Sequence, residues 1–155
     1  MKISRLINDR LIISKLKGKS KNKVLEELAK HLALNEKNVD SDELLRVLIE
    51  REKLGSTGIG DGIAIPHGKL NGLENIILGF GKSSEGIDFD SIDSKPVTLI
   101  FLLVAPSNSA GIHLKALARL SRLLKDKNFR QELLDASDAK SLYKIIIRED
   151  ERISA

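Results

Sequence analysis

Residues 55 to 68 read GSTGIGDGIAIPHG and end on one of the three histidines of this 155-residue chain. Five of these 14 positions are glycine, and His67 stands between Pro66 and Gly68. Proline fixes its own φ and favours an extended residue before it, whereas glycine allows another group to come close. A neutral imidazole is a nucleophile, since one nitrogen can attack while the other donates its proton to a carbonyl. The stretch therefore indicates a backbone shaped to bring a reactant to His67.

Taken alone, a Pro-His-Gly triplet is more often a turn than a catalytic site. The longer run REKLGSTGIGDGIAIPHGKL closely resembles the phosphorylation-site signature of bacterial phosphotransferase-system IIA proteins of the fructose/mannitol type. That signature has an acidic residue, six spacers, an aliphatic-glycine pair and then xxIAIPHG. Glu52 occupies the acidic position, Ile59-Gly60 the pair, and residues 63–68 the rest without a gap. IDFDSIDSKPVTLIFLLVAP and HLKALARLSRLL resemble later family segments, so the likeness covers residues 50 to about 125.

By this resemblance His67 accepts a phosphoryl group on Nε2 (tele) from a histidine-containing phosphocarrier protein. Arg51 and His113 match two further active-site positions of the family and would stabilise the phosphate. A phosphoryl group brings a charge of roughly −2, which the permanently charged, planar fork of arginine can grip through two oxygens. His113 would lie at the start of a helix, where free N–H groups favour an anion. The resemblance implies no cofactor and no metal, and transfer that needs no magnesium.

The length of the chain and the residues of the run REKLGSTGIGDGIAIPHGKL look closest to the nitrogen-regulatory branch of this family. That branch implies a phosphorylation-dependent regulator of target proteins, of the nitrogen or potassium metabolism type. The alternative is a fructose/mannitol-type sugar-transport component that passes phosphate to a IIB domain. Because both branches share the acceptance chemistry, the signature does not separate them.

Two alternatives of other classes come from the two histidines and from a run of lysines. A metal-dependent hydrolase would use His67 and His113, but the sequence lacks a compact ligand set such as H-E-x-x-H. A non-catalytic basic adaptor would act through the run from Lys17 to Lys23. Residues 1–30 contain nine Lys/Arg against three acidic residues, although such a run is more often a solvated loop. No aromatic residue precedes Phe80, so no stacking platform for bases exists there and no nucleic-acid partner is expected.

Other polar residues carry less chemistry. Asp88, Asp90 and Asp93 lie close together but lack the glycine and terminal glutamate of a calcium loop, which predicts a surface turn. The glycine run lacks the G-x-x-x-x-G-K-[ST] pattern of a nucleotide site. His31 fits no pattern and is expected to be structural.

Composition predicts one domain over residues 1–155 in the cytoplasm. Hydrophobic residues make up 41% and charged residues 31% of the chain, which is typical of a globular protein. The chain has no cysteine, which fits a reducing compartment and excludes thiolate catalysis. Its longest apolar run, residues 99–105, is far shorter than the ~20 residues of a membrane span, so no membrane insertion is expected.

The periodicity of apolar residues predicts strands interspersed with helices. Strands are expected at residues 11–16, from Ile63 onwards, at 75–81 and at 96–106, the last apolar throughout and so covered on both faces. Helices are expected after the caps Ser20 and Asp40, from His113 with a stripe of Leu114, Leu117, Ala118 and Leu124, and at 129–134 and 141–147. The expected fold class is α/β (α+β), a mixed β-sheet flanked by helices on both sides.

Overall fold

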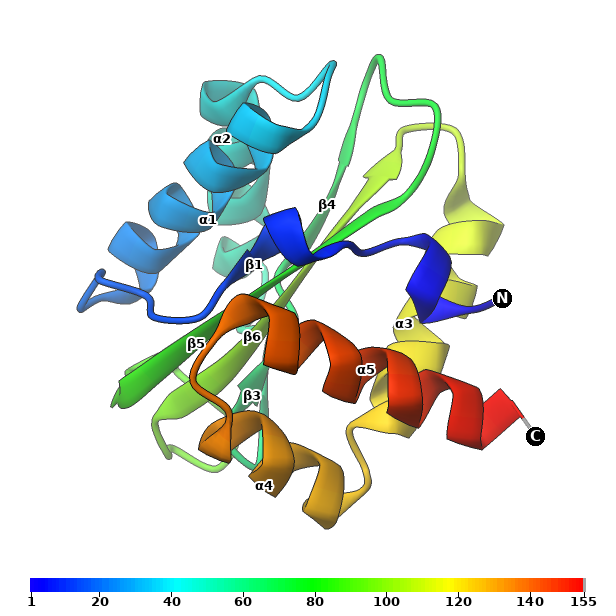
Figure 1. Ribbon diagram of the computed structural model, residues 1–155. Helices are drawn as coiled ribbons and strands as arrows, with labels where there is room; N and C mark the ends of the chain where they lie inside the picture. The colour runs from blue at the N-terminus through cyan, green and yellow to red at the C-terminus, as the bar shows by residue number, and fades with distance from the viewer. Residues whose placement is uncertain (155) are drawn as a thin grey trace.

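The computed structural model describes residues 1–154 and places a mixed sheet between two layers of helices (Figure 1). The strands are β1 (Ile12–Ile13), β2 (Gly58–Gly60), β3 (Ile63–Ala64), β4 (His67–Leu70), β5 (Ile77–Ile87) and β6 (Val97–Pro106). Helices α1 (Lys21–Asn35) and α2 (Ser41–Lys53) cover one face, and α3 (Ala110–Leu123), α4 (Lys127–Asp135) and α5 (Ala139–Ser154) cover the other. Short 3-10 helices, η1 (Ile3–Arg5) and η2 (Asp9–Leu11), precede β1. The expected fold class is confirmed.

Strand β6 is central and buried on both faces, as its apolar sequence predicts. It pairs antiparallel with β5 on one side and parallel with β3 and β4 on the other. Its side chains alternate: Leu99, Phe101 and Leu103 pack toward α3 to α5, and Ile100 and Leu102 pack toward α1 and α2. This alternation is the two-residue period of a strand, and it gives the protein two hydrophobic layers on one sheet.

The N-terminal half follows its local signals closely. Ser20 caps α1 by accepting from Lys23 N, and the Asp40 carboxylate caps α2. The predicted strand at 11–16 is reduced to Ile12–Ile13, the two residues in parallel register with β5, although Leu16 N also donates to Lys82 O of β5 at 2.8 Å. The strand expected from Ile63 onwards pairs with residues 58–60, which makes a β2–β3 hairpin. Its turn is Asp61-Gly62, and both residues have positive φ, the conformation that an Asp-Gly hairpin turn requires.

Two expectations for the C-terminal half are wrong in detail. Leu114 is 67% exposed and Ala118 is also exposed, whereas Ala116, Leu120 and Leu123 form the buried face of α3. The other two predicted residues do pack inward, since Leu124 is 3% exposed and Leu117 packs against the core. The helical period is therefore confirmed, and the buried face of α3 is turned toward the neighbouring stripe. Helix α5 runs to Ser154 rather than ending at 147, because its buried acidic residues have cationic partners. Asp150 is fully buried and pairs with Arg119 of α3 at 2.7 Å, which fixes α5 to α3.

The helices are amphipathic, with polar residues on the face that points away from the sheet. In α5, Leu142 and Ile146 are buried while Arg148 and Glu151 are exposed. Among the helices of residues 1–154, none has the length and apolar composition needed to cross a membrane.

Candidate active site

His67 is the first residue of β4 and stands where one edge of β6 changes its partner strand. Strands β3 and β4 both pair with that edge, and Ile65 and Pro66 form the break between them. Leu103 N donates to Pro66 O at 3.0 Å, which holds the break against β6. His67 is opposite Leu103 in the register, so its side chain lies on the sheet face covered by α3. Rigid neighbours thus fix the position from which the imidazole projects.

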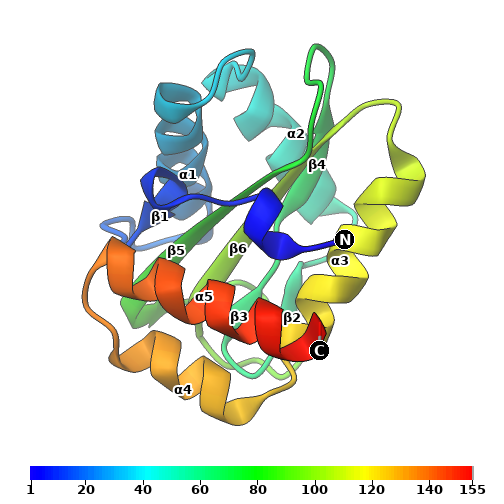
Figure 2. The same cartoon turned by 45° about the vertical axis from the view of Figure 1, so that its right-hand side comes forward.

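Gly68 allows α2 to approach β4 closely (Figure 2). A Cβ at this position would come within 2.5 Å of Val47 Cγ1, a separation that real side chains do not reach. Arg51 lies four residues beyond Val47, about one helical turn, and therefore comes level with the start of β4. The glycine after the histidine is thus explained by packing: it lets α2 bring Arg51 to His67.

The hydrogen bonds of His67 select one neutral tautomer. Its Nδ1 lies 2.8 Å from Ile65 O and donates its proton there, so Nε2 keeps a free electron pair. Arg51 Nε donates to that Nε2 at 3.3 Å. Burial of the half-buried ring is the largest cause lowering the pKa of His67 below 6.5, and the Arg51 charge lowers it further. The Ile65 carbonyl and the Glu52 charge oppose part of this shift. The result is a neutral imidazole with an available nitrogen.

His113 approaches the His67 ring from a different layer of the fold. It is the fourth residue of α3, and its ring centroid is 5.3 Å from that of His67 in an edge-on arrangement. Only 8% of the residue is exposed, and its Nε2 is buried with no hydrogen-bond partner among residues 1–154. Burial is the largest cause lowering the pKa of His113, followed by the charges of His67 and Lys69. An unpaired buried nitrogen costs about 1–3 kcal/mol, and this one belongs to a ring that lies against His67.

Arg51 is anchored at one end and open at the other. Its Nη1 donates to Gly55 O at 2.8 Å, in the turn that follows α2. Its Nη2 makes no hydrogen bond within residues 1–154. The structure thus brings together the three residues that the sequence singled out, one each from α2, β4 and α3. An anion held at Nε2 of His67 would have the Arg51 fork and the His113 ring as neighbours.

The other polar residues considered from the sequence make no hydrogen bond to His67 or Arg51, although Asp90 Oδ2 lies 3.9 Å from Lys21 Nζ. His31 Nε2 is 2.7 Å from Arg10 O, a contact that ties α1 to η2, as expected of a structural histidine. The Asp88 and Asp93 carboxylates accept from backbone N–H groups of their own turn, as expected of a surface turn. In the part of the chain that the structure describes, no three His, Cys, Asp or Glu side chains gather in a way that could hold a metal ion.

Sequence reasoning missed two residues that support the site. Lys21 and Thr57 both bind the Glu52 carboxylate, directly beside Arg51. The signature includes Glu52 as its acidic position but implies no role for it. No local pattern predicts its contact with Lys21, which lies 31 residues earlier in the chain. Only the packing of α1 on α2 brings the two charges together.

Comparison with known proteins gives consistent relatives over nearly the whole chain. The sequence model described as "Phosphoenolpyruvate-dependent sugar phosphotransferase system, EIIA 2" matches residues 5–149. A "Nitrogen regulatory protein" of Bradyrhizobium diazoefficiens is 43% identical over 94% of this chain and 95% of its own length. The "PTS system fructose-specific EIIABC component" of Bacillus subtilis is 36% identical over 97% of this chain, but the match covers 24% of that longer protein.

The fold has a counterpart of the same kind among solved structures. The crystal structure of nitrogen regulatory protein IIA-Ntr from Neisseria meningitidis superposes with a TM-score of 0.86 at 34% sequence identity. The superposition covers 93% of this chain and 98% of that one. The family match of the sequence and the structural superposition therefore point to the same kind of protein.

Proposed function

Because this chain belongs to the EIIA 2 family of the phosphoenolpyruvate-dependent sugar phosphotransferase system, whose members are phosphotransferase components, we propose that it is a phosphohistidine carrier. His67 accepts the phosphoryl group on Nε2 from a histidine-containing phosphocarrier protein. The observation that carries the proposal is the hydrogen bond from Nδ1 to Ile65 O, which leaves Nε2 unprotonated beside Arg51. Residues 1–155 act as one carrier domain in the cytoplasm.

The transfer exchanges one phosphorus–nitrogen bond for another. The electron pair of Nε2 attacks phosphorus, and the bond to the donor histidine breaks with its electron pair leaving on the donor nitrogen. The proton on Nδ1 stays in place, because Ile65 O holds it throughout. The protein's task is mainly to align the two rings and to stabilise the anionic transition state.

Arg51 and His113 supply that stabilisation in the proposed mechanism. Arg51 turns its Nε–H from the ring nitrogen to a phosphoryl oxygen, while Nη2 reaches a second oxygen. His113 Nε2 has no partner among residues 1–154 of the unphosphorylated protein. In the tautomer that carries its proton on Nε2, His113 donates from this nitrogen to a phosphoryl oxygen. Since fixed cationic and neutral donors supply the counter-charge, we expect acceptance to proceed at the same rate in excess chelator.

The first experiment is incubation with phosphoenolpyruvate, the general phosphotransferase enzyme and the phosphocarrier. We expect one acid-labile, base-stable phosphate per chain, and none on the His67→Ala variant. Equal labelling of that variant would contradict the assignment of His67.

Two downstream roles share this chemistry, and we favour the regulatory one. The match to the Bradyrhizobium nitrogen regulatory protein covers 94% of this chain and 95% of that protein. A phosphoryl group at His67 would change the charge of the surface by which target proteins are bound. The alternative, a sugar-transport component, draws on the likeness to the fructose-specific protein of Bacillus subtilis. Transfer of the label onward to a sugar-specific IIB domain would decide for that alternative.

A further inference from the structure

Glu52 is a buried carboxylate in an electrostatically poor place. It follows Arg51 in the last turn of α2, where the helix dipole disfavours negative charge, and its side chain is only 6% exposed. A carboxylate in such a position is stable only with cationic or N–H and O–H partners. Glu52 has three, and they come from two other segments of the chain.

The partners of Glu52 join α1, α2 and the glycine-rich turn. Lys21 Nζ, from the first turn of α1, lies 2.8 Å from Oε1, and the Lys21 side chain is 16% exposed. Thr57 N donates to Oε1 at 3.0 Å, and the Thr57 hydroxyl donates to Oε2 at 2.5 Å. Lys21 also lies 4.9 Å from the centroid of the Phe89 ring, which closes the network on the outer side.

This network adds to the backbone bonds of the turn that holds Arg51, which include Gly55 N donating to Glu52 O at 3.2 Å. The two bonds from Thr57 to Glu52 close residues 54–56 into a fixed turn directly after α2. Gly55, inside that turn, supplies the carbonyl that accepts from Arg51 Nη1 at 2.8 Å. The same guanidinium donates from Nε to His67 Nε2. A continuous series of contacts thus runs from the Glu52 carboxylate through the turn and Arg51 to the nitrogen that we propose as the nucleophile.

We propose that Glu52 is a positioning residue for phosphoryl transfer: through Thr57 it fixes the Gly55 turn, and the turn aims the Arg51 fork at Nε2 of His67. Lys21 balances the carboxylate charge, so that Glu52 does not repel the incoming phosphoryl group. This inference rests on the proposed function and deepens it. Glu52 makes no hydrogen bond to the His67 ring within the described residues. Its charge opposes part of the lowering of the His67 pKa directly, whereas its effect on the geometry of the site passes through Arg51.

The kinetic test is a double-mutant cycle on the rate of phosphoryl acceptance from the phosphocarrier. Glu52→Gln keeps the size of the side chain but loses the charge that holds Lys21 and weakens the grip on Thr57. We expect the maximal transfer rate to fall about tenfold or more, because small misplacements of an aligning group are costly, with the half-saturating donor concentration changed less than about twofold. In an Arg51→Lys background the same substitution should have a much smaller effect. Equal effects in the two backgrounds would overturn the proposal.

Matched variants separate positioning from general damage. Thr57→Val removes only the hydroxyl and should slow transfer, whereas Thr57→Ser keeps it and should restore most of the rate. This pair keeps the test open if Glu52→Gln does not fold. Glu50→Gln is the control, because Glu50 is exposed and pairs with Arg46 instead. Loss of transfer in Thr57→Ser equal to that in Thr57→Val would count against the hydroxyl bond.

A second readout does not need phosphoryl transfer at all. The Nε–H signal of Arg51 in the nitrogen–proton NMR spectrum should be distinct in the unmodified protein and should move or broaden in Glu52→Gln. If the unmodified protein accepts no phosphate, the proposed function fails while this signal still tests the positioning. An Arg51 signal unchanged by Glu52→Gln would overturn the inference, whatever the outcome of the transfer assay.

Discussion

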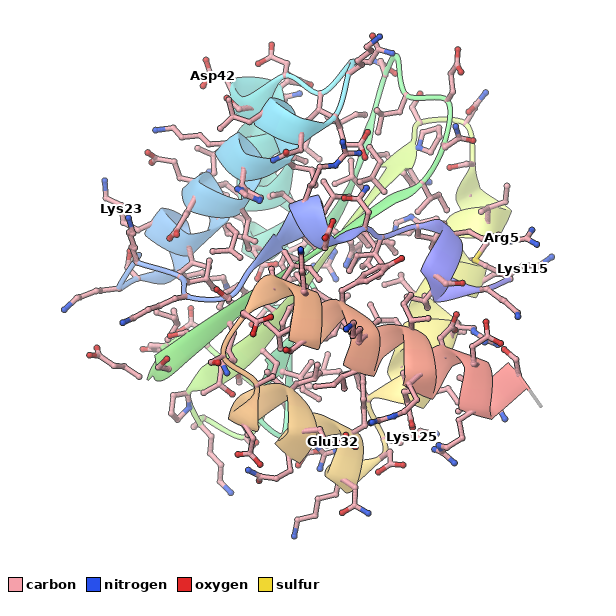
Figure 3. The ribbon with its side chains drawn as sticks, viewed as in Figure 1. Arg5, Lys23, Asp42, Lys115, Lys125 and Glu132 are labelled. Carbon is pink, nitrogen blue, oxygen red and sulfur yellow. The ribbon has the colours of Figure 1, made fainter. Side chains whose placement is uncertain are left out.

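Two regions carry concentrated charge but arrange it in opposite ways: the turn beside His67, residues 54–56 with Arg51 just before it, and the basic loop. The basic loop is defined as residues 17–23 and includes the first three residues of α1. At the turn, Arg51 points inward and meets His67 and the Gly55 carbonyl. In the basic loop, Lys17, Lys19 and Lys23 are exposed and make no ion pair within residues 1–154. Figure 3 shows Lys23 pointing away from the start of α1. A high density of charge in the sequence therefore does not by itself identify a candidate active site. The candidate site is distinguished by an arginine that contacts the ring nitrogen of His67.

The basic loop has a shape of its own that explains its outward charges. The Glu27 carboxylate accepts from the backbone N–H groups of Lys17 and Gly18 at 2.9 to 3.1 Å. This acidic side chain therefore binds the backbone rather than the ammonium group of a lysine. Lys21 is the exception in this loop, since it turns inward to Glu52. The loop thus contributes one lysine to the support of the site and leaves the others in solvent.

The largest effect on this comparison should come from Arg51→Lys. Lysine keeps the charge but loses the planar fork that holds Gly55 O and His67 together. We expect the acceptance rate to fall about 100-fold, as for loss of one aligned transition-state donor, with the fold unchanged. Single-turnover transfer from labelled phosphocarrier measures the rate, and circular dichroism checks the fold. Transfer at the parent rate would show that convergence at Arg51 is not needed.

His113→Leu should move activity and stability in opposite directions. The substitution removes a buried nitrogen that lacks a partner, so we expect the free energy of unfolding to rise by about 1 kcal/mol. It also removes a donor from the proposed phosphoryl site, so acceptance should slow by about tenfold or more. Urea denaturation and the transfer assay give the two numbers. A loss of both stability and activity would instead identify His113 as a core residue.

The pH dependence should follow the lowered pKa values of both site histidines. His67 and His113 have folded-state pKa values below 6.5, so they stay neutral at pH values where an ordinary imidazole is already protonated. We expect acceptance to be flat above pH 6.5 and to decline only at lower pH. The unfolded chain takes up these protons first, so the free energy of unfolding should also fall as pH drops below 6.5. Histidine NMR titration together with rates checks both, and a decline starting above pH 7 would contradict the tautomer argument.

The smallest effect should come from neutralising the basic loop. Replacing Lys17, Lys19 and Lys23 together by Gln should leave the acceptance rate within about twofold at physiological salt, because exposed charges are strongly screened. The free energy of unfolding should change by no more than about 0.5 kcal/mol per substitution. A large, salt-dependent loss of partner binding in this variant, with His67→Ala binding normally, would favour the basic adaptor instead.

Local signals in the sequence predicted much of the fold. The structure confirms the helix caps Ser20 and Asp40, which depend only on neighbouring residues in the chain. It also confirms the apolar strand at 96–106, which is buried on both faces. The buried face of α3 was misjudged, because the choice between adjacent stripes is made by the sheet and by α5. Lys82 was not noticed: it is 7% exposed, and its ammonium binds the Leu133 carbonyl at the end of α4, a contact between distant segments.

The candidate site was predictable in its members but not in its geometry. His67, Arg51 and His113 were found through the resemblance, which records types and spacing. The tautomer of His67 depends on Ile65 O, which the chain direction alone does not place. The close approach of α2 at Gly68 and the bonds of Glu52 arise from packing between segments. Long-range contacts of this kind leave no periodic trace in a sequence, so they had to come from the structure.

The most direct test is to identify the phosphorylated nitrogen. The protein, labelled with nitrogen-15 in its histidines, is phosphorylated through phosphoenolpyruvate and the phosphocarrier and observed by NMR. We predict a single phosphoryl group on Nε2 of His67, with Nδ1 still protonated and bonded to the Ile65 carbonyl. Phosphate on Nδ1 of His67, on His113, or on neither histidine would contradict the central claim.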